Sequence, residues 1–167
     1  VVVVVVAAVL VQHVCLGAQL DTSTSQCAGH GVFSLQLNET LYDLKVAILP
    51  TESGQSVIMR FMRDASQYVD MAHWITDKAA CRIIQAGYRT GGATLIVGPR
   101  GSGRTTTQYT SIMNMGPHDK KVITIESDIN TYLPHVHQVC VDTSDTAAMV
   151  DTLRACKQQC PDILMLD

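Results

Sequence analysis

The stretch Leu95-Ile-Val-Gly-Pro-Arg-Gly-Ser-Gly-Arg-Thr-Thr-Thr-Gln-Tyr109 decides how the rest of the chain is interpreted. Its three leading apolar residues predict a buried parallel strand. A glycine-rich turn follows, and then a threonine-rich stretch that can open a helix. This order is typical of a phosphate-binding loop, because such a turn and the helix N-terminus behind it aim several backbone N–H groups at one anion.

Residues Gly98 to Thr105 match the phosphate-loop (Walker A) motif Gly-x4-Gly-Lys-[Ser/Thr] with one exchange. Arg104 stands in the place of the lysine, which weakens the motif, because arginine keeps the charge but is a longer, planar group. The exchange therefore favours phosphate binding over fast hydrolysis. Thr105 occupies the position whose hydroxyl would bind a magnesium ion. A glycine-rich turn that binds nothing is the alternative interpretation.

The composition is that of a globular protein. The chain has 167 residues, of which 47% are hydrophobic and 16% charged, so it can form one ordinary domain or two small ones. Its net charge of −3 gives no electrostatic reason to expect DNA or RNA as a partner. The chain lacks an initial methionine and stops within an apolar stretch, so we expect it to be part of a longer protein.

The apolar run from Val1 to Val11 is too short to span a bilayer, which needs about 20 residues. It also lacks the basic segment of a signal peptide, so we interpret it as a strand, a buried segment or an artefact. The six cysteines include no Cys-x2-Cys pair, and Cys156-x3-Cys160 has no matching pair nearby. This spacing favours reduced thiols in a cytosolic protein over zinc or disulfides.

The first third of the chain predicts a short helix and a small antiparallel sheet. The helix is expected within residues 9–20 and is followed by a loop. Alternating apolar residues and turn signals predict strands at residues 32–37, 41–49 and 56–62, with a hairpin turn at Asn38-Glu39 and a stop at Pro50. Residues 63–90 have helical periodicity instead.

The part after the loop predicts alternating helices and parallel strands. The helices are expected at residues 105–115 and 146–159, the second capped by Asp145, and the strands at residues 120–125, 136–141 and 163–166. Glu126 and Asp167 then follow two strands at one sheet edge, where ligands bind in α/β folds. An aspartate in that place is suited to hold magnesium through water.

These motifs, in this order, resemble the hexameric secretion ATPases of type II secretion and type IV pilus systems over almost the whole chain. The segments that carry the resemblance are Tyr42 to Thr51, Gly54 to Arg60, Gly98 to Thr107, Ile123 to Glu126, and Leu153 to Ala155 with Pro161 to Ile163.

The resemblance implies an α/β fold: a RecA-like P-loop NTPase core, truncated here, preceded by a small α+β antiparallel domain. It divides the chain into an N-terminal domain (1–62), a helical linker (63–90) and an ATPase domain (91–167). It also implies ATP and Mg²⁺ as cofactors and a homo-hexameric ring that drives filament or pilus assembly. Secretion-system or inner-membrane platform proteins would be its partners, and it would be cytoplasmic, with peripheral contact to the inner membrane as a further expectation.

The resemblance also implies roles for individual residues. Glu126 would be the general base or water-positioning carboxylate, with Arg104 as a second catalytic residue, and Thr105 and Asp167 would bind the metal. The expected nucleotide contacts are Gly98, Pro99, Arg100, Gly101, Ser102, Gly103, Arg104, Thr105, Thr106, Lys45 and Arg60.

The sequence departs from the family pattern at chemically important positions. Arg100 replaces a threonine, Arg104 replaces the lysine, and Ser127-Asp128 stands in the place of Asp-Pro. A degenerate relative that binds a nucleotide or a partner without turnover is therefore the alternative function. A small P-loop kinase is a third possibility, but the N-terminal antiparallel sheet argues against it.

Overall fold

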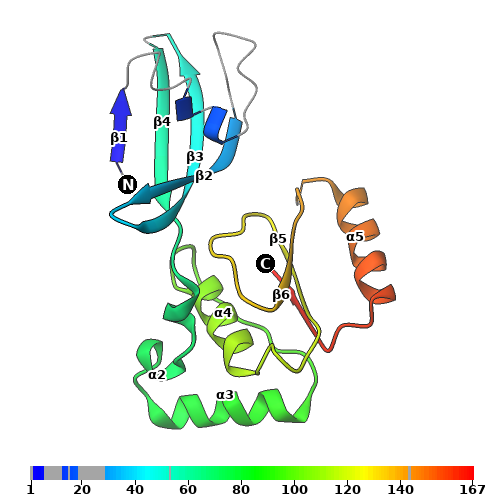
Figure 1. Cartoon of the computed structure of the whole chain (residues 1–167). Coiled ribbons are helices and arrows are strands. Elements are labelled where there is room, and N and C mark those ends of the chain that lie inside the picture. Colours follow the sequence, from blue (N-terminus) through cyan, green and yellow to red (C-terminus); the bar gives the residue numbers. More distant parts are fainter. Residues whose placement is uncertain (1, 6–12, 15, 19–28, 53, 143) are drawn as a thin grey trace. The chain divides into compact units, whose positions relative to one another are not determined.

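The chain forms two compact units, Val1–Met62 and Arg63–Asp167. The computed structural model describes residues 2–5, 13–14, 16–18, 29–52, 54–142 and 144–167 (Figure 1). Each unit contains one sheet, antiparallel in the first and parallel in the second, so the predicted α/β class with a preceding antiparallel domain is confirmed.

The first unit is built on a four-stranded antiparallel sheet in the order β1-β4-β3-β2 (Figure 1). Its strands are β1 (Val2–Val5), β2 (Gly29–Leu37), β3 (Thr40–Thr51) and β4 (Gly54–Phe61). The valine run thus provides a strand, as one of its three interpretations had it. Residues 13–14 and 16–17 are helical, while the other residues of the predicted helix and residues 19–28 of the loop lie outside the described residues.

Alternation along the strands produces the core of this unit. Val46, Ile48 and Val57 point to one face of the sheet and pack with Val14 and Ala18. Because side chains alternate between the two faces of a strand, a period of two buries one face and leaves the other in solvent.

The predicted hairpin turn is confirmed at Asn38 and Glu39, whose φ angles of 46° and 66° are typical of a two-residue turn that matches strand twist. The predicted stop at Pro50 is wrong, since β3 continues to Thr51. Pro50 lies at the end of the ladder opposite Gln55, next to the turn closed by the bond from Thr51 Oγ1 to Gly54 O (2.7 Å). A missing N–H is tolerated at such a position.

Residues 63–90 are helical as predicted, but aspartates divide them into three short elements. These are the 3-10 helix η1 (Ala65–Tyr68), α2 (Met71–Trp74) and α3 (Lys78–Thr90). Asp64, Asp70 and Asp77 each accept a hydrogen bond at 2.7–2.8 Å from the backbone N–H two residues later. An aspartate in that position stabilises a new helix start, so the run cannot continue as one helix.

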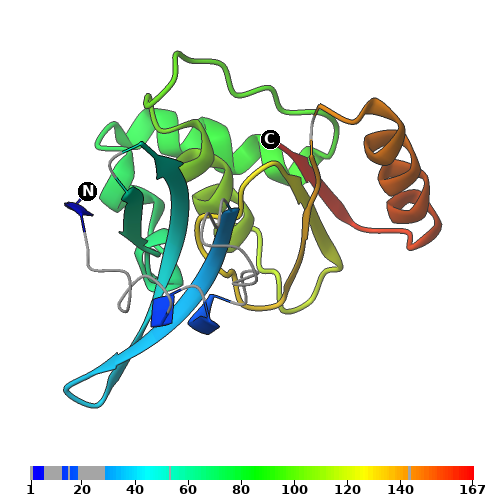
Figure 2. The ribbon, with the colours of Figure 1, turned by 90° about the horizontal axis from the view of Figure 1, so that it is seen from above.

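The second unit has a parallel sheet in the order β6-β5-β7 between two helices (Figure 2). Its elements are α4 (Arg104–Asn114), β5 (Val122–Glu126), β6 (Val136–Cys140), α5 (Thr146–Gln158) and β7 (Ile163–Leu166). These bounds agree with the predicted helices and strands to within two residues.

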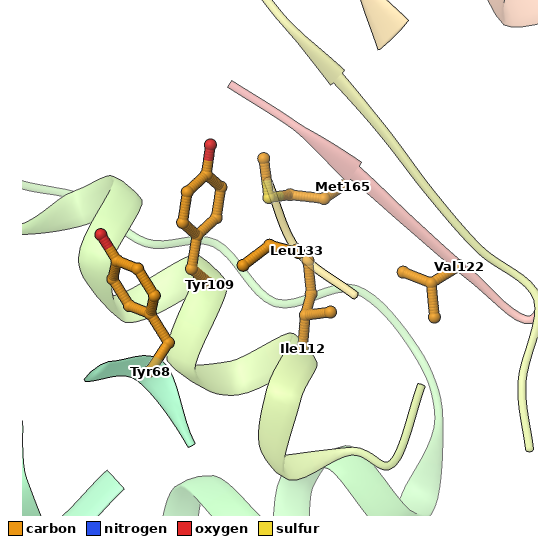
Figure 3. Close-up of a cluster of buried hydrophobic side chains, with 6 residues drawn as sticks. All are labelled: Tyr68, Tyr109, Ile112, Val122, Leu133 and Met165. Carbon is orange, nitrogen blue, oxygen red and sulfur yellow. The ribbon is translucent and has the colours of Figure 1, made fainter. Parts of the chain in front are cut away.

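Strand β5 is buried on both faces. Val122 packs with Tyr109 and Ile112 of α4 on one face, and Figure 3 shows this cluster, which also contains Tyr68 of η1. Ile123 and Ile125 pack with residues of α5 on the other face. The helical segment 63–90 therefore shares a core with the phosphate-loop helix.

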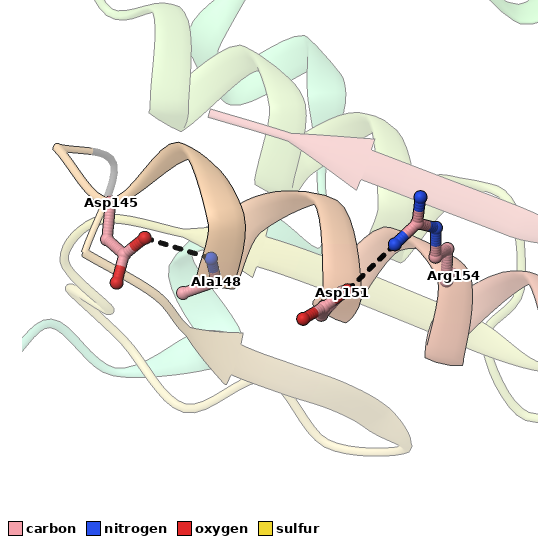
Figure 4. Close-up of polar contacts among 4 residues, drawn as sticks. All are labelled: Asp145, Ala148, Asp151 and Arg154. Carbon is pink, nitrogen blue, oxygen red and sulfur yellow. Dashed lines mark hydrogen bonds and ion pairs between the residues drawn. The ribbon is translucent and has the colours of Figure 1, made fainter.

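Helix α5 begins at its predicted cap. Asp145 Oδ1 accepts a hydrogen bond of 3.0 Å from the backbone N–H of Ala148 (Figure 4). The ion pair between Asp151 and Arg154 on the same helix is exposed, so it adds little stability.

The predicted strand at Leu95–Val97 is wrong. These residues form an irregular segment, and the side chains of Leu95 and Val97 are 88% and 82% exposed. A strand needs a hydrogen-bonded neighbour, and no strand of the described chain pairs with this segment. Three apolar residues in a row indicate that a segment can be buried, but they do not indicate whether a neighbouring strand is present to pair with it.

No helix in the described parts of the chain is long and apolar enough to cross a membrane. The described cysteines Cys81, Cys140, Cys156 and Cys160 are free thiols, and Cys15 and Cys27 lie outside the described residues.

The burial of β5 leads to a prediction about the stability of the second unit. Ile125→Ala, at a side chain with no exposed surface, should lower the free energy of unfolding by about 3 kcal/mol, because a cavity replaces buried methyl groups. Ile83→Ala on α3, where the side chain is 72% exposed, is the matched control and should change it by less than about 0.5 kcal/mol. Urea denaturation measures both, and equal effects would contradict the assigned core.

Candidate phosphate-binding site

The glycine-rich loop between Leu95–Val97 and α4 has a conformation that side chains would disturb. A Cβ atom on Gly98 would collide with Ser102 Oγ, and Gly101 and Gly103 have φ angles of 80° and 94°. The backbone N–H of Ser102 donates to Pro99 O at 3.2 Å and closes a turn. The backbone conformation therefore favours glycine at positions 101 and 103, while a side chain at position 98 would require the side chain of Ser102 to move.

Helix α4 begins without a side-chain cap. Within the described segment 98–114, Gly103 is the N-cap and makes no side-chain hydrogen bond to the first turn, which also contains no acidic residue. By contrast, η1, α2, α3 and α5 all begin with an aspartate that accepts a backbone N–H. Uncapped N–H groups and the positive end of the helix dipole together favour an anion at this end of α4.

The two predicted metal ligands lie next to each other. Thr105 Oγ1 donates a hydrogen bond of 3.1 Å to Asp167 Oδ2. Asp167 follows β7, and its backbone N–H donates to Ile125 O at 3.1 Å, which fixes the carboxylate beside the end of β5. A hydroxyl and a carboxylate are oxygen ligands of the kind that Mg²⁺ prefers.

Magnesium would need further ligands at this place. Among the described residues, no group of three or more His, Cys, Asp or Glu side chains is close enough to hold a metal ion. Mg²⁺ commonly uses one or two protein ligands together with substrate phosphates and water. The pair Thr105 and Asp167 therefore fits a metal that arrives with a phosphate compound.

Arg104 lies at the first position of α4, exposed to solvent. Its Cγ atom would be 3.8 Å from a Cβ built on Gly98, so its stem runs beside the start of the loop. Arg104, Gln108 and Asp167 line a cavity of about 630 Å³. Its other walls come from the end of α3 (Gly87 and Tyr88), residues 91–96, the C-terminal part of α4 with Met115, and residues 162–166. This volume is in the usual range of small-molecule pockets.

Glu126 is buried, whereas a residue that positions a water molecule must reach solvent or the ligand. Its side chain has no exposed surface. Oε1 accepts hydrogen bonds from Thr124 Oγ1 (2.5 Å) and Gln138 Nε2 (3.2 Å), and Oε2 accepts one from the hydroxyl of Tyr109. The base role implied by the resemblance stays a prediction, because it needs the carboxylate to reach a water molecule.

Sequence reasoning missed Tyr109 and Gln138 as partners of this carboxylate. Burial, together with the hydrogen bond to Glu126, raises the pKa of Tyr109 above its usual range, so the phenol remains a proton donor at all ordinary pH values. No local pattern indicates these partners, because Tyr109 and Gln138 lie 17 and 12 residues from Glu126 in the sequence.

The other predicted contacts are distributed over both units. Pro99 and Arg100 lie exposed on the loop, and Thr106 is half-buried in the first turn of α4. Lys45 and Arg60 are opposite each other on β3 and β4 of the first unit, so they share one face of that sheet. Their roles toward a phosphate stay predictions.

Comparison with known proteins gives a consistent result. The family model described as "Type II/IV secretion system protein" matches residues 3–167. The type II secretion system protein E of Pseudomonas aeruginosa is 27% identical over 161 residues, which cover 96% of this chain and 32% of that protein. The protein HxcR of the same organism is 29% identical, with 95% and 34% covered. The type II secretion system ATPase E of Vibrio cholerae is 27% identical, with 94% and 31% covered.

A solved structure supports the fold. The X-ray structure of the ATPase DotB of Legionella pneumophila matches with a TM-score of 0.58 and 15% identity, over 83% of this chain and 40% of that one. At this identity the match shows the fold alone. The chain spans about a third of the length of the curated relatives named above.

The loop geometry makes a binding prediction. Gly103→Ala should weaken the binding of ATP at least about tenfold, because alanine rarely adopts the φ angle of 94° that Gly103 has at the start of α4, so the backbone N–H groups there must move. Ile83→Ala on α3 is the control, since its exposed side chain is not among the residues that line the cavity. Isothermal titration calorimetry measures both variants, and an unchanged affinity of Gly103→Ala would contradict the site.

Proposed function

The chain belongs to the type II/IV secretion system protein family, and on this premise we propose that it is the nucleotide-binding part of a secretion ATPase. The observation that carries the proposal is the contact of Thr105 with Asp167 at the uncapped start of α4. It combines an anion site with two oxygen ligands for a metal, and a nucleotide with Mg²⁺ needs both.

The residues present fit ATP and Mg²⁺. Backbone N–H groups of the loop and of the first turn of α4 would bind the phosphates, and Arg104 adds a positive charge at the same end. Thr105 and Asp167 would hold the metal. When bound, Mg²⁺ would supply positive charge that offsets the negative charge of the phosphates.

We propose a homo-hexameric ring in which ATP binds between subunits and hydrolysis drives filament or pilus assembly. Lys45 and Arg60 would be further phosphate contacts within the ring, because paired cations on one sheet face are suited to bind polyphosphate. The ring would work in the cytoplasm, against inner-membrane platform proteins of the secretion system.

Nucleotide binding without turnover is a second candidate. Arg104 in the lysine position and the buried, fully engaged carboxylate of Glu126 favour it. In that case the chain would serve assembly through nucleotide-dependent contacts with a partner rather than through repeated hydrolysis.

The metal site makes the first test. Thr105→Ala should abolish most of the increase in ATP affinity that Mg²⁺ provides, because it removes the hydroxyl next to Asp167. A fluorescent ATP analogue titrated with and without Mg²⁺ measures this. Thr90→Ala is the control, because its hydroxyl bonds to its own helix at Gly87 O. Equal magnesium dependence in wild type and Thr105→Ala would contradict the proposal.

The variant Arg104→Lys distinguishes an ATPase limited by its arginine from a protein that binds nucleotide without turnover. If arginine limits hydrolysis, the variant should release phosphate faster, by about tenfold or more, because lysine is the compact charge that reaches the β- and γ-phosphates. Arg82→Lys, an exposed residue of α3, is the control. An unchanged rate would mean that the arginine is not the limiting defect.

A further inference from the structure

Glu126 is a buried carboxylate that the proposed mechanism leaves without a role. A charge without exposed surface is costly unless hydrogen bonds satisfy it. Here Thr124, Gln138 and Tyr109 all donate to it, from β5, β6 and α4. We name Glu126, Tyr109 and Gln138 the buried cluster. Three elements of the sheet-and-helix core thus converge on one side chain.

The buried cluster also fixes the segment after β5, which we name loop 127–133. The hydroxyl of Tyr109 accepts a hydrogen bond of 3.5 Å from the backbone N–H of Asn130. Gln138 holds the loop at two further points: its Nε2 donates to Thr131 O (3.0 Å), and its Oε1 accepts from the N–H of Leu133 (2.7 Å). Two of the three side chains that bind Glu126, those of Tyr109 and Gln138, therefore also position the loop.

Loop 127–133 begins beside the proposed metal site. Strands β5 and β7 are parallel neighbours, so Ser127-Asp128 leaves the sheet at the edge where Asp167 ends β7. On α4, Tyr109 follows Thr105 by four residues and lies on the same helix face. One helical turn thus separates the residue that would bind the metal from the residue that holds the loop.

We propose that the buried cluster couples nucleotide binding at α4 to the position of loop 127–133, which carries the Asp128 carboxylate. Glu126 is then a positioning residue that acts through Tyr109 and Gln138 and does not contact the nucleotide. This inference rests on the proposed function, because the coupling needs a ligand at the start of α4. If a bound nucleotide moves α4, the position of loop 127–133 changes with it, since Tyr109 belongs to α4 and its hydroxyl is bonded to Asn130 of the loop.

Hydrogen exchange of the full 167-residue chain, with and without a non-hydrolysable ATP analogue and Mg²⁺, tests the coupling. In wild type, the analogue should slow the exchange of loop 127–133. Tyr109→Phe should bind the analogue within about threefold of wild type, because the hydroxyl faces Glu126 and not the cavity. Its loop should exchange about tenfold faster, since the backbone N–H of Asn130 loses its acceptor, and should no longer respond to the analogue.

Tyr88→Phe is the matched control. It removes a tyrosine hydroxyl that also bonds to α4, at Ser111 Oγ in the wall of the cavity, but contacts no residue of loop 127–133 in the described hydrogen bonds. Exchange of the variants is therefore compared at equal occupancy by the analogue. Its loop should respond to the analogue as in wild type. A response of the Tyr109→Phe loop equal to that of Tyr88→Phe would overturn the coupling.

Glu126→Gln separates this role from that of a base. A base variant binds nucleotide, retains the loop response and loses turnover. A positioning variant loses the loop response as Tyr109→Phe does, and the two changes together should have no more effect than either alone. If wild type binds no nucleotide, the proposed function and the coupling both fail. In that case, faster loop exchange in Tyr109→Phe would still show that the cluster holds the loop.

Discussion

The second unit depends on the complete enclosure of β5. This strand is hydrogen-bonded on both edges, to β6 and β7, and covered on both faces, by α4 and α5. Because side chains alternate, Val122, Thr124 and Glu126 point toward α4, while Ile123 and Ile125 point toward α5. The polar half of this pattern ends in a carboxylate, so the strand that forms the core also carries a charge into it.

The enclosure of β5 explains why the candidate site forms where it does. Two parallel strands end beside the start of α4, and Asp167 is held there by a backbone bond to Ile125. The site is thus assembled from strand ends and a helix start, which are rigid elements, and the functional groups need no long loop to reach one another. Figure 3 shows Tyr109 and Ile112 of α4 in one buried cluster with Leu133 and with Met165 of β7.

Much of this arrangement could be predicted from local signals. The Asp145 cap, the Asn38-Glu39 turn and the strands before Glu126 and Asp167 each depend on residues near in sequence, and each is observed. The irregular course of Leu95–Val97 could not be predicted, because a strand depends on a neighbour that the local pattern does not specify. The three bonds to Glu126 were missed for the same reason, since two of the donors are 12 and 17 residues away.

The contrast between aspartate and glycine at the helix starts has a thermodynamic consequence. An aspartate cap contributes about 1 kcal/mol to the stability of its helix, and α4 begins without such a contribution at Gly103. A bound phosphate would provide it from outside the chain. The ligand then acts as the missing capping group for a first turn that the bond from the Thr107 N–H to Gly103 O (2.8 Å) already closes. Occupancy of the site would therefore raise the stability of α4 at its N-terminal end.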